Sequence, residues 1–319
     1  MKRLLTVAVL AGCVAALAAG CTPAAQTVPR NAVPSFRPPV PAGVQDPAVV
    51  PSAAAAGASD CDPRASLRPG TGGATPNVDR IRKRGRLIVG VDQNTYLFGY
   101  RDATSGHVVG FDIDIAKQIA QAILGDPERI QLVAITAAQR IPFVQNGTVD
   151  IVVDTMTINC DRLKQVAFST VYYDAGQMVL VPRTSSATGI ADLGGKKVCA
   201  AAGSTSIVNI ADAPSHPVAV SVADWTDCLV MLQQGQVDAI STDDTILAGM
   251  AAQDPNTKLV GQPFTKEPYG VAMSRSAPDL VRFVNGVLER IRADGTWATI
   301  YTHWRGGPAP LPPAATYSD

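Results

Sequence analysis

Two charged side chains stand where they could hold a small charged molecule. Arg162 follows Asn159-Cys160-Asp161, a pattern typical of a helix start, so its guanidinium would project from a first helical turn. A guanidinium fork pairs with a carboxylate through two N–H donors. Asp243 stands at a predicted strand-to-helix junction and offers an acceptor to a cation, whereas neighbouring Asp244 suits an N-cap. The alternative for Arg162 is a surface ion pair with Asp161.

Other kinds of chemistry find little support in the sequence. The three histidines, His107, His216 and His303, share no metal-ligand spacing, and the cysteines form no C-x-x-C pair. The turn at Gly203-Ser204-Thr205-Ser206 is too short for a phosphate-binding loop and lacks its Lys. Lys plus Arg and Asp plus Glu both number 27, so there is no basic excess for a nucleic acid. We expect no cofactor, no metal and no nucleic-acid partner.

The N-terminal residues are typical of an exported chain. Lys2 and Arg3 precede an apolar run that is too short to span a membrane, so residues 1–20 predict a signal peptide. Ala18-Ala19-Gly20-Cys21 resembles a bacterial lipobox, which implies a lipid on Cys21 and an anchor at the outer face of the cell membrane. Ordinary secretion is the alternative. Residues 21–60 are rich in Pro and Ala and predict an extended tether, and 306–319 predict a Pro-rich tail.

Four cysteines remain after Cys13 and Cys21 are set aside. Cys61, Cys160, Cys199 and Cys228 are an even number, which in an exported protein predicts two disulfides. Four cysteines allow three pairings, and their spacing alone does not choose among them. Free, inert thiols are the alternative.

The rest of the chain alternates strand and helix patterns, which indicates an α/β fold with largely parallel sheets. The expected strands are 86–92, 130–135, 149–153, 178–181, 197–201, 217–222, 237–241 and 269–274. The expected helices are 111–124, 138–146, 225–234, 244–252, 278–293 and 296–304.

One short pattern occurs twice. Gln145-Asn146-Gly147-Thr148-Val149-Asp150 has the same form as Gln233-Gln234-Gly235-Gln236-Val237-Asp238: a helix end, a Gly cap, then Val-Asp before a strand. This connection is common in α/β proteins, so it can be a coincidence. The alternative is a pair of similar lobes, each giving the carboxyl edge of its sheet to a shared cleft.

An ordered set of motifs resembles the polar amino-acid-binding proteins of family 3 of the extracytoplasmic solute-binding proteins. The set spans roughly residues 78–305, and within the family it is most similar to actinobacterial glutamine/glutamate-binding lipoproteins of ABC importers. The motifs are Gly110-Phe111-Asp112-Ile113-Asp114-Ile115-Ala116, Arg140-Ile141-Pro142, 145–150, Thr155-Met156-Thr157-Ile158, Asp161-Arg162, 203–206, Asp238-Ala239, Asp243, Asp294-Gly295-Thr296-Trp297 and Tyr301-Thr302-His303-Trp304.

The resemblance implies a two-lobed periplasmic-binding-protein-like fold of type II, with two parallel-type sheets and two hinge crossings. Lobe one would hold residues 61–175 and 270–305, and lobe two would hold 176–269. Disulfides within each lobe would leave the hinge free to move. On that ground we expect the pairs Cys61–Cys160 and Cys199–Cys228.

The resemblance also assigns a ligand site for a free amino acid, in which each buried charge needs a partner. Arg162, with the backbone N–H groups that follow Gly203, would bind the α-carboxylate. Asp243 and the loop at Asp154 would bind the α-ammonium. The full expected set is Asp92, Tyr96, Phe98, Arg140, Asp154, Thr155, Thr157, Arg162, Ser204, Thr205 and Asp243.

The side-chain head of the ligand would meet Arg140 and Asp92. Arg140 suits the distal carboxylate of glutamate or aspartate and the carbonyl of glutamine, whereas Asp92 suits an amide NH₂. An Arg140–Asp92 pair that only shapes the pocket is the alternative. Tyr96 and Phe98 would contact the aliphatic part. Ala137 stands where relatives often carry an aromatic, and Ala201 where glutamine binders can carry a Lys, so strict glutamine selectivity does not follow.

The function that follows is that of a monomeric, lipid-anchored binding protein that delivers a polar amino acid to an ABC permease. A sensor that docks on a membrane signalling protein would share the fold and the trap. A dehydratase-type enzyme on this fold is a remote alternative, because Asp92 or Asp243 would need a catalytic partner that the sequence does not offer.

Overall fold

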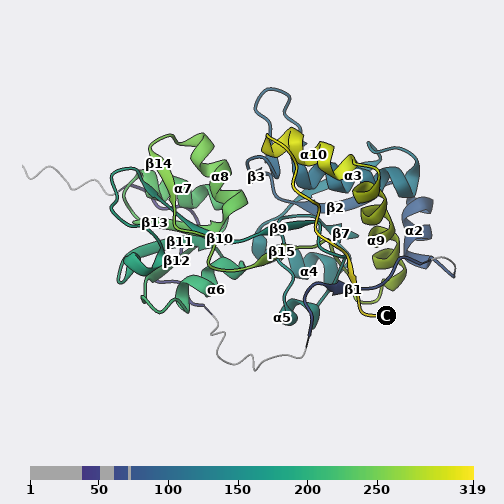
Figure 1. The fold of residues 1–319 in the computed structure, drawn as a ribbon, viewed down its shortest axis with the longest axis horizontal. Coiled ribbons are helices and arrows are strands. Elements are labelled where there is room, and N and C mark those ends of the chain that lie inside the picture. Colours follow the sequence, from purple (N-terminus) through teal and green to yellow (C-terminus); the bar gives the residue numbers. More distant parts are fainter. Residues whose placement is uncertain (1–37, 51–60, 71–72) are drawn as a thin grey trace, which may run out of the picture. The chain divides into compact units, whose positions relative to one another are not determined.

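The computed structural model describes residues 38–50, 61–70 and 73–319. The predicted signal peptide at 1–20 and Cys21 lie outside these residues. Residues Val40–Asp319 form one compact unit, built of two lobes that each contain a five-stranded sheet (Figure 1). Among the described residues, no helix has both the length and the apolar character that crossing a bilayer requires.

Lobe one is built on a sheet with the strand order β6-β2-β7-β16-β8. Strand β2 pairs in parallel with β6 and β7, and β16 pairs antiparallel with β7 and β8. The strands are β2 (Leu87–Val91), β6 (Ile130–Ala134), β7 (Ile151–Val152), β8 (Ala167–Phe168) and β16 (Ala272–Met273). The helices are α2 (Pro76–Arg84), α3 (Phe111–Leu124), η2 (Ala137–Gln139), α4 (Arg140–Gln145), α5 (Cys160–Leu163), α9 (Pro278–Ala293) and α10 (Thr296–Arg305).

Lobe two is built on a sheet with the order β12-β11-β13-β10-β14. Strand β11 pairs in parallel with β12 and β13, and β10 pairs antiparallel with β13 and β14. The strands are β10 (Gln177–Pro182), β11 (Lys197–Ala201), β12 (Val218–Val222), β13 (Ala239–Asp243) and β14 (Thr257–Val260). The helices are η3 (Ile190–Leu193), α6 (Thr205–Ala211), α7 (Trp225–Gln233) and α8 (Asp244–Gln253).

The two sheets repeat one plan, which confirms the two-lobed fold expected from the repeated pattern. Helices α4 and α7 end at Gln145 and Gln233, and each is followed by a Gly at positive φ, Gly147 at 75° and Gly235 at 66°. The Asp that closes each pattern then accepts a backbone N–H from the start of the neighbouring strand, β2 in lobe one and β11 in lobe two. Asp150 accepts the N–H of Ile88 at 2.9 Å, and Asp238 accepts the N–H of Lys197 at 2.8 Å.

The sheets are mixed rather than parallel throughout, which differs from the expected parallel type. In each sheet four strands run in the same direction, and one strand, β16 in lobe one and β10 in lobe two, runs antiparallel to them. The reason is the crossing of the chain between lobes. Strand β10 enters lobe two from lobe one, and β16 returns to lobe one from lobe two, so each joins its sheet from the hinge side.

The lobes are connected by the antiparallel pair β9 (Tyr173–Ala175) and β15 (Glu267–Tyr269). These strands lie between the two sheets in Figure 1, at the positions where the sequence places its two crossings. Residues 94–109 form a small antiparallel sheet before α3, with β3 (Asn94–Thr95), β4 (Gly99–Arg101) and β5 (Val108–Val109).

The core of lobe one is rich in aromatic rings, and it fixes the start of α3. Phe98, Phe111, Tyr173 and Tyr269 are buried side by side, with ring centroids 5.2–6.3 Å apart. Gly110 begins α3 at φ 141°, and a Cβ there would lie 2.0 Å from the carbonyl oxygen of Phe98. Only glycine therefore allows α3 to start at Phe111, which puts Asp112 in its first turn.

Both expected disulfides are present. Cys61 pairs with Cys160 in lobe one, and Cys199 pairs with Cys228 in lobe two. Cys199 and Cys228 lie in the core of their lobe, whereas Cys61 is exposed. Neither bond crosses the hinge.

The described part of the predicted tether is not a free spacer. Gln45 pairs with Ser221 of β12, the N–H of Ala48 donates to the carbonyl of Ala219 at 2.8 Å, and Asp46 forms an ion pair with Lys197. The segment 45–50 (hereafter the edge segment) therefore covers the open edge of the lobe-two sheet. An unpaired edge strand presents N–H and C=O groups that a neighbouring chain can satisfy, and this explains the difference.

The predicted tail also belongs to the fold. Strand β17 (Thr316–Tyr317) pairs in parallel with β1 (Ala65–Ser66) on lobe one. Asp319 then accepts the N–H of Arg68 at 2.7 Å and forms an ion pair with Arg282. Composition alone suggested a free end because Pro residues predominate between Gly307 and Ala314; the pairing residues follow them.

Candidate functional site

The expected site residues gather at the carboxyl ends of the parallel strands in both lobes. Asp92 follows β2, and Asp154 with Thr155 follows β7. In lobe two, Ser204 follows β11 after a short turn, and Asp243 is the last residue of β13. Carboxyl ends of parallel strands are where open α/β sheets bind ligands, so the topology of both sheets leads to one shared cleft.

Arg162 is a buried cation, and the described part of the chain gives it no carboxylate partner. The side chain of Asn159 caps α5 by accepting the N–H of Arg162 at 2.9 Å, as the sequence predicts. The guanidinium donates to the carbonyl of Thr157 at 2.6 Å and, across the cleft, to the carbonyl of Gly203 at 3.2 Å. Within the described ranges no Asp or Glu oxygen lies within 4.0 Å of it. Asp161 pairs instead with Lys164, so the surface ion pair does not form.

The electrostatics of Arg162 favour an anion beside it. Burial and the positive charge of Arg140 together lower the pKa of Arg162 to about 9, against the opposing effect of Glu267 and Asp243. A bound carboxylate would oppose both effects and raise the pKa, because it pairs with the charged form of the guanidinium. The site therefore gains most from a ligand that brings a negative charge to Arg162.

Asp243 is the matching buried acid. Its Oδ2 accepts the hydroxyl of Tyr269 at 2.6 Å, while its Oδ1 is buried and has no partner among the described residues. Burial, with the nearby charge of Glu267, raises the pKa of Asp243 to about 8. The expected N-cap at Asp244 is wrong: Asp243 holds the cap position, and Asp244 accepts the N–H of Gly176 at 3.2 Å beside the hinge.

The loop after β7 carries three expected ligand residues. Asp154, Thr155 and Thr157 are each at most 4% exposed. Thr155 adopts a left-handed conformation with φ 39°, and its Oγ1 is buried without a partner in the described part of the chain. The carbonyls of Asp154 and Thr157 accept N–H groups of Arg140 and Arg162, so this backbone holds both cations in place.

Arg140 and Asp92 do not form the pair that the sequence left open. Arg140 donates to the carbonyls of Ala137 and Asp154, each at 3.0 Å, and its Nε lies 4.0 Å from Asp154 Oδ2. Asp92 binds its own turn, where it accepts the N–H of Asn94 at 2.8 Å and the hydroxyl of Thr95. Burial raises the pKa values of Asp92 and Asp154, and for Asp154 the raised pKa is partly offset by Arg140.

Ser204 and Thr205 lie at the start of α6, the helix that follows β11. Ser204 caps α6: its hydroxyl accepts the N–H of Ile207 at 3.2 Å and donates to Ala201. Thr205 donates to Glu267 at 3.0 Å. Glu267 was not predicted; it lies on β15, is 3% exposed, and also accepts from Thr265 at 2.7 Å. An acidic residue next to an expected hinge crossing is the signal that would have identified it.

The two aromatic residues expected at the site have different environments in the structure. Tyr96 is half-buried, and its ring lies 4.7 Å from that of Tyr100. Phe98 is fully buried in the aromatic core of lobe one, where Phe111, Tyr173 and Tyr269 surround it. The structure therefore gives Phe98 a packing role instead of an open face toward the cleft. The alternation of polar and apolar residues along 94–99 is too short to predict which of the two rings points into the core.

The lobes meet around this cleft. Asn94 donates to Asp224 at 3.2 Å, from lobe one to lobe two. A Cβ on Gly203 would lie 2.7 Å from Cα of Ala138, and one on Gly249 would lie 2.6 Å from the carbonyl oxygen of Tyr96. Small residues at both contacts let the backbones approach closely, which leaves the charged side chains of the site almost inaccessible to water.

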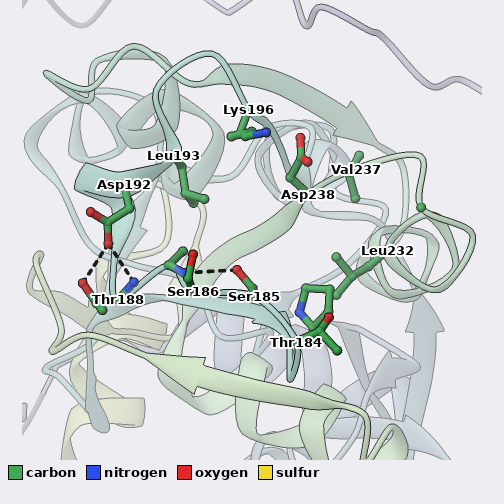
Figure 2. A pocket seen from close by; sticks show the side chains of 13 residues that line it. Thr184, Ser185, Ser186, Thr188, Asp192, Leu193, Lys196, Leu232, Val237 and Asp238 are labelled. Carbon is green, nitrogen blue, oxygen red and sulfur yellow. Dashed lines mark hydrogen bonds between the residues drawn. The ribbon is translucent and has the colours of Figure 1, made fainter.

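Two larger cavities lie outside this buried centre. One of about 620 Å³ reaches Arg162 and is lined by both lobes and by Gln45, Val49 and Val50 of the edge segment. The other, of about 740 Å³, lies wholly on lobe two (Figure 2). Figure 2 shows Asp192 bonded to Thr188, whose hydroxyl donates to it at 2.7 Å. The second cavity holds none of the expected site residues.

Comparison with known proteins agrees with this geometry. Residues 87–307 match the family model of bacterial extracellular solute-binding proteins, family 3. The chain is 42% identical over 225 residues to the ABC transporter glutamine-binding protein GlnH of Bacillus subtilis, which covers 70% of this chain and 82% of that protein. It is 29% identical over 248 residues to a glutamate/aspartate import solute-binding protein of Escherichia coli, with 74% and 82% covered.

Solved structures show the same fold. A mutant of the arginine-binding protein of T. maritima superposes with a TM-score of 0.68 at 30% identity, over 72% of this chain and all of that one. An ancestral arginine-binding protein bound to glutamine gives a TM-score of 0.66 at 36% identity, over 70% and 99%. With the matched region spanning both sheets and the cleft, the chain belongs to family 3 of the bacterial extracellular solute-binding proteins.

Proposed function

We propose that this protein binds a free polar amino acid, glutamine, glutamate or aspartate, outside the cytoplasm and delivers it to an ABC permease. The ligand is bound and released without chemical change. Support comes from the glutamine-binding and glutamate/aspartate-binding relatives and from the family match over both lobes. Lipid attachment at Cys21 is part of the proposal and would keep the protein near the permease.

The observation that carries the proposal is the pair Arg162 and Asp243. Both are buried, one is a cation and the other a carboxylic acid, and they lie on opposite sides of the hinge. Among the described residues, the guanidinium of Arg162 has only carbonyl partners and Asp243 Oδ1 has none. An amino acid offers an α-carboxylate to the first and an α-ammonium to the second, and burial makes each of these pairings strong. A ligand with both groups therefore completes the cleft.

Thr155 and Thr157 complete the set we assign to the ammonium side, and Ser204 and Thr205 begin the helix on the carboxylate side. Asp154 fixes Arg140, which with Asp92 would select the side-chain head. Tyr96 would contact the aliphatic part. Phe98 is retained only as a packing residue behind this set, since its ring is enclosed by other rings.

Titration calorimetry of the protein beginning at residue 38 against the twenty amino acids tests the proposal. We expect tight binding of glutamine, glutamate or aspartate, and a loss of at least about 100-fold in affinity for Arg162→Ala, because a buried carboxylate would lose its partner. Arg183→Ala is the matched control. Arg183 is an Arg of lobe two whose Nε donates to the carbonyl of Pro255, away from the cleft. No heat with any amino acid, or affinity within a few-fold for Arg162→Ala, would overturn the proposal.

A further inference from the structure

Asp112 is a buried acid that the proposed ligand set does not use. It is the second residue of α3 and is 2% exposed. Its Oδ2 accepts the backbone N–H of Thr155 at 2.8 Å, and its Oδ1 accepts the hydroxyl of Tyr172 at 2.8 Å. Both oxygens are therefore bound to lobe one, and one of them is bound to the loop that carries the ligand residues.

That loop has a conformation that needs support. Thr155 has a φ of 39°, which L-residues with a branched Cβ rarely adopt. A hydrogen bond from its N–H to a buried carboxylate is of the strong, charge-assisted kind and opposes relaxation to negative φ. The same loop gives the carbonyl of Asp154 to Arg140 and that of Thr157 to Arg162. A change of φ at Thr155 would move these two carbonyls relative to each other.

We propose that Asp112 is a positioning residue for ligand binding: it holds Thr155 in the left-handed conformation that leaves Thr155 Oγ1 free for the ligand and keeps Arg140 and Arg162 in place. The inference rests on the proposed function, because it assigns Asp112 to that same site. Asp112 itself touches none of the ligand. The glycine at 110 explains its location, since only that residue lets α3 begin where its first turn faces the loop.

The chemistry of Asp112 predicts which substitutions matter. Burial raises the pKa of Asp112 to about 7, and the hydrogen bonds from Tyr172 and Thr155 act in the opposite direction. A neutral group with one acceptor and one donor also fits, because a tyrosine hydroxyl can accept as well as donate. Asp112→Asn therefore keeps both contacts, with its oxygen toward Thr155 and its NH₂ toward Tyr172. Asp112→Ala removes both.

The first test compares Asp112→Ala and Asp112→Asn with the unaltered protein by calorimetry, at a temperature where circular dichroism shows each to be folded. The ligand is the amino acid among glutamine, glutamate and aspartate that the unaltered protein binds most tightly. We expect Asp112→Ala to weaken binding by about 10- to 100-fold and Asp112→Asn by less than about fivefold. Equal losses for the two variants, or no loss for either, would overturn the inference.

Asn285→Ala is the matched control for a purely structural role. Asn285 is fully buried on α9, accepts the N–H of Thr170 at 2.7 Å, and donates to Ser66 and Leu67. None of these partners belongs to the site. We expect this variant to lose stability and to keep its affinity, so a loss of affinity comparable with that of Asp112→Ala would show that destabilisation alone explains both.

A double-mutant cycle with Thr155→Gly tests the route of the effect. Glycine adopts positive φ without strain, so the loop then needs less support. We expect Asp112→Ala to weaken binding less in the Thr155→Gly background than in the unaltered protein. Additive effects would mean that Asp112 does not act through Thr155.

Amide hydrogen exchange at Thr155 separates this inference from the proposed function, because it needs no ligand. We expect slow exchange in the unaltered protein and in Asp112→Asn, and fast exchange in Asp112→Ala. If no amino acid binds the unaltered protein, the proposed function fails, and exchange at Thr155 alone then decides whether Asp112 holds the loop. Slow exchange in Asp112→Ala would overturn the inference even if the protein binds glutamine.

Discussion

Arg140 lies where a charged group would choose between an acid and an amide. Its guanidinium is fixed by the carbonyls of Ala137 and Asp154, so it cannot turn away when the ligand changes. A distal carboxylate gains a full Coulomb attraction from it, whereas the carbonyl of an amide gains only a hydrogen bond. The residue is therefore better suited to discriminate between ligands than to provide general affinity.

Replacing Arg140 by Ala should weaken glutamate and aspartate binding more than glutamine binding, by about tenfold or more in the ratio of affinities. Calorimetry with all three ligands on the same preparation measures that ratio. The control is Arg183→Ala, for which the ratio should stay as it is. Equal losses for acid and amide would mean that Arg140 only shapes the loop.

The buried acids also predict how stability depends on pH. Asp243 has its pKa raised to about 8 and Asp112 to about 7, compared with about 4 in an unfolded chain. A group with a raised pKa contributes stability that is fully present below the unfolded value and is lost as pH rises through the folded value. Between pH 4 and 8 the ligand-free protein should therefore become less stable, by up to about 1.4 kcal/mol per pH unit for each such group.

Asp243→Asn should reduce this loss, because the amide does not titrate. Urea unfolding at pH 5, 6.5 and 8, without ligand, gives the free energy of unfolding for both proteins. The variant should show a shallower decline, with the remainder due to Asp112, Asp92 and Asp154, whose pKa values are also raised. Parallel declines would show that Asp243 is already charged in the folded protein.

Residue types singled out Arg162 and Asp243, and the resemblance to the family added the lobes that imply both disulfides, but neither predicted the partners of the two charged side chains. Asn159 caps α5 as expected because capping is a local interaction. The unpaired Oδ1 of Asp243 and the left-handed Thr155 depend on contacts between distant segments. Phe98 illustrates the same point. The sequence does not distinguish Tyr96 from Phe98 in their loop, and only the packing of Tyr173 and Tyr269 around Phe98 determines which ring is enclosed.

Among the elements, those with their own periodic pattern were predicted almost to the residue. Helices α3 and α9 and strand β11 have the expected bounds, because an apolar stripe or a buried run is visible in the sequence itself. The short strands β8, β9, β14 and β15 were missed, because two to four residues carry too little pattern to predict a strand. Such strands form only where a partner strand is available. The edge segment was missed for the same reason.

The edge segment should contribute measurable stability to lobe two. Gln45 and Ser221 exchange two backbone hydrogen bonds of 2.9 and 3.0 Å, Ala48 adds a third, and Asp46 pairs with Lys197. At about 0.5–1.5 kcal/mol for each hydrogen bond, removal should lower the free energy of unfolding by roughly 1.5–4 kcal/mol.

Urea unfolding of a protein beginning at residue 61 against one beginning at residue 38 measures this contribution. Both retain the Cys61–Cys160 disulfide, so the comparison isolates residues 38–60. Asp46→Ala in the longer protein is the companion variant and should lose less than about 1 kcal/mol, because the ion pair with Lys197 is partly exposed. Identical unfolding curves for the two lengths would show that the edge segment adds nothing.

At the scale of the whole molecule, closure of the two lobes around a ligand depends on how closely their backbones can approach each other. Gly249 of α8 lies against the carbonyl of Tyr96, where a Cβ would come within 2.6 Å. Gly249→Ala should stabilise α8, since Ala favours a helix over Gly by about 1 kcal/mol. It should also keep the lobes apart and weaken ligand binding by about tenfold or more.

Opposite changes in stability and affinity would be the signature of a blocked closure. Calorimetry and urea unfolding measure the two quantities, and small-angle scattering with saturating ligand should show a larger radius of gyration for the variant. Gly189→Ala is the control, because a Cβ there has no atom within 4 Å and its φ of 175° is open to any residue. Unchanged affinity in Gly249→Ala would mean that the ligand closes the lobes by another path.

The pairing of the edge segment has a consequence for a chain that is still being made. Gln45 leaves the ribosome long before Ser221, which lies 176 residues later. At roughly 5–20 residues per second, its partner strand arrives about 10 to 35 s afterwards. Throughout that interval the edge segment has no partner strand, because β12 has not yet been made. Pro47, inside the edge segment, cannot donate to a ladder, which makes premature pairing with the first strands of lobe one less favourable. A proline within a stretch whose composition suggests a spacer thus also favours the later, native pairing of the edge segment with β12.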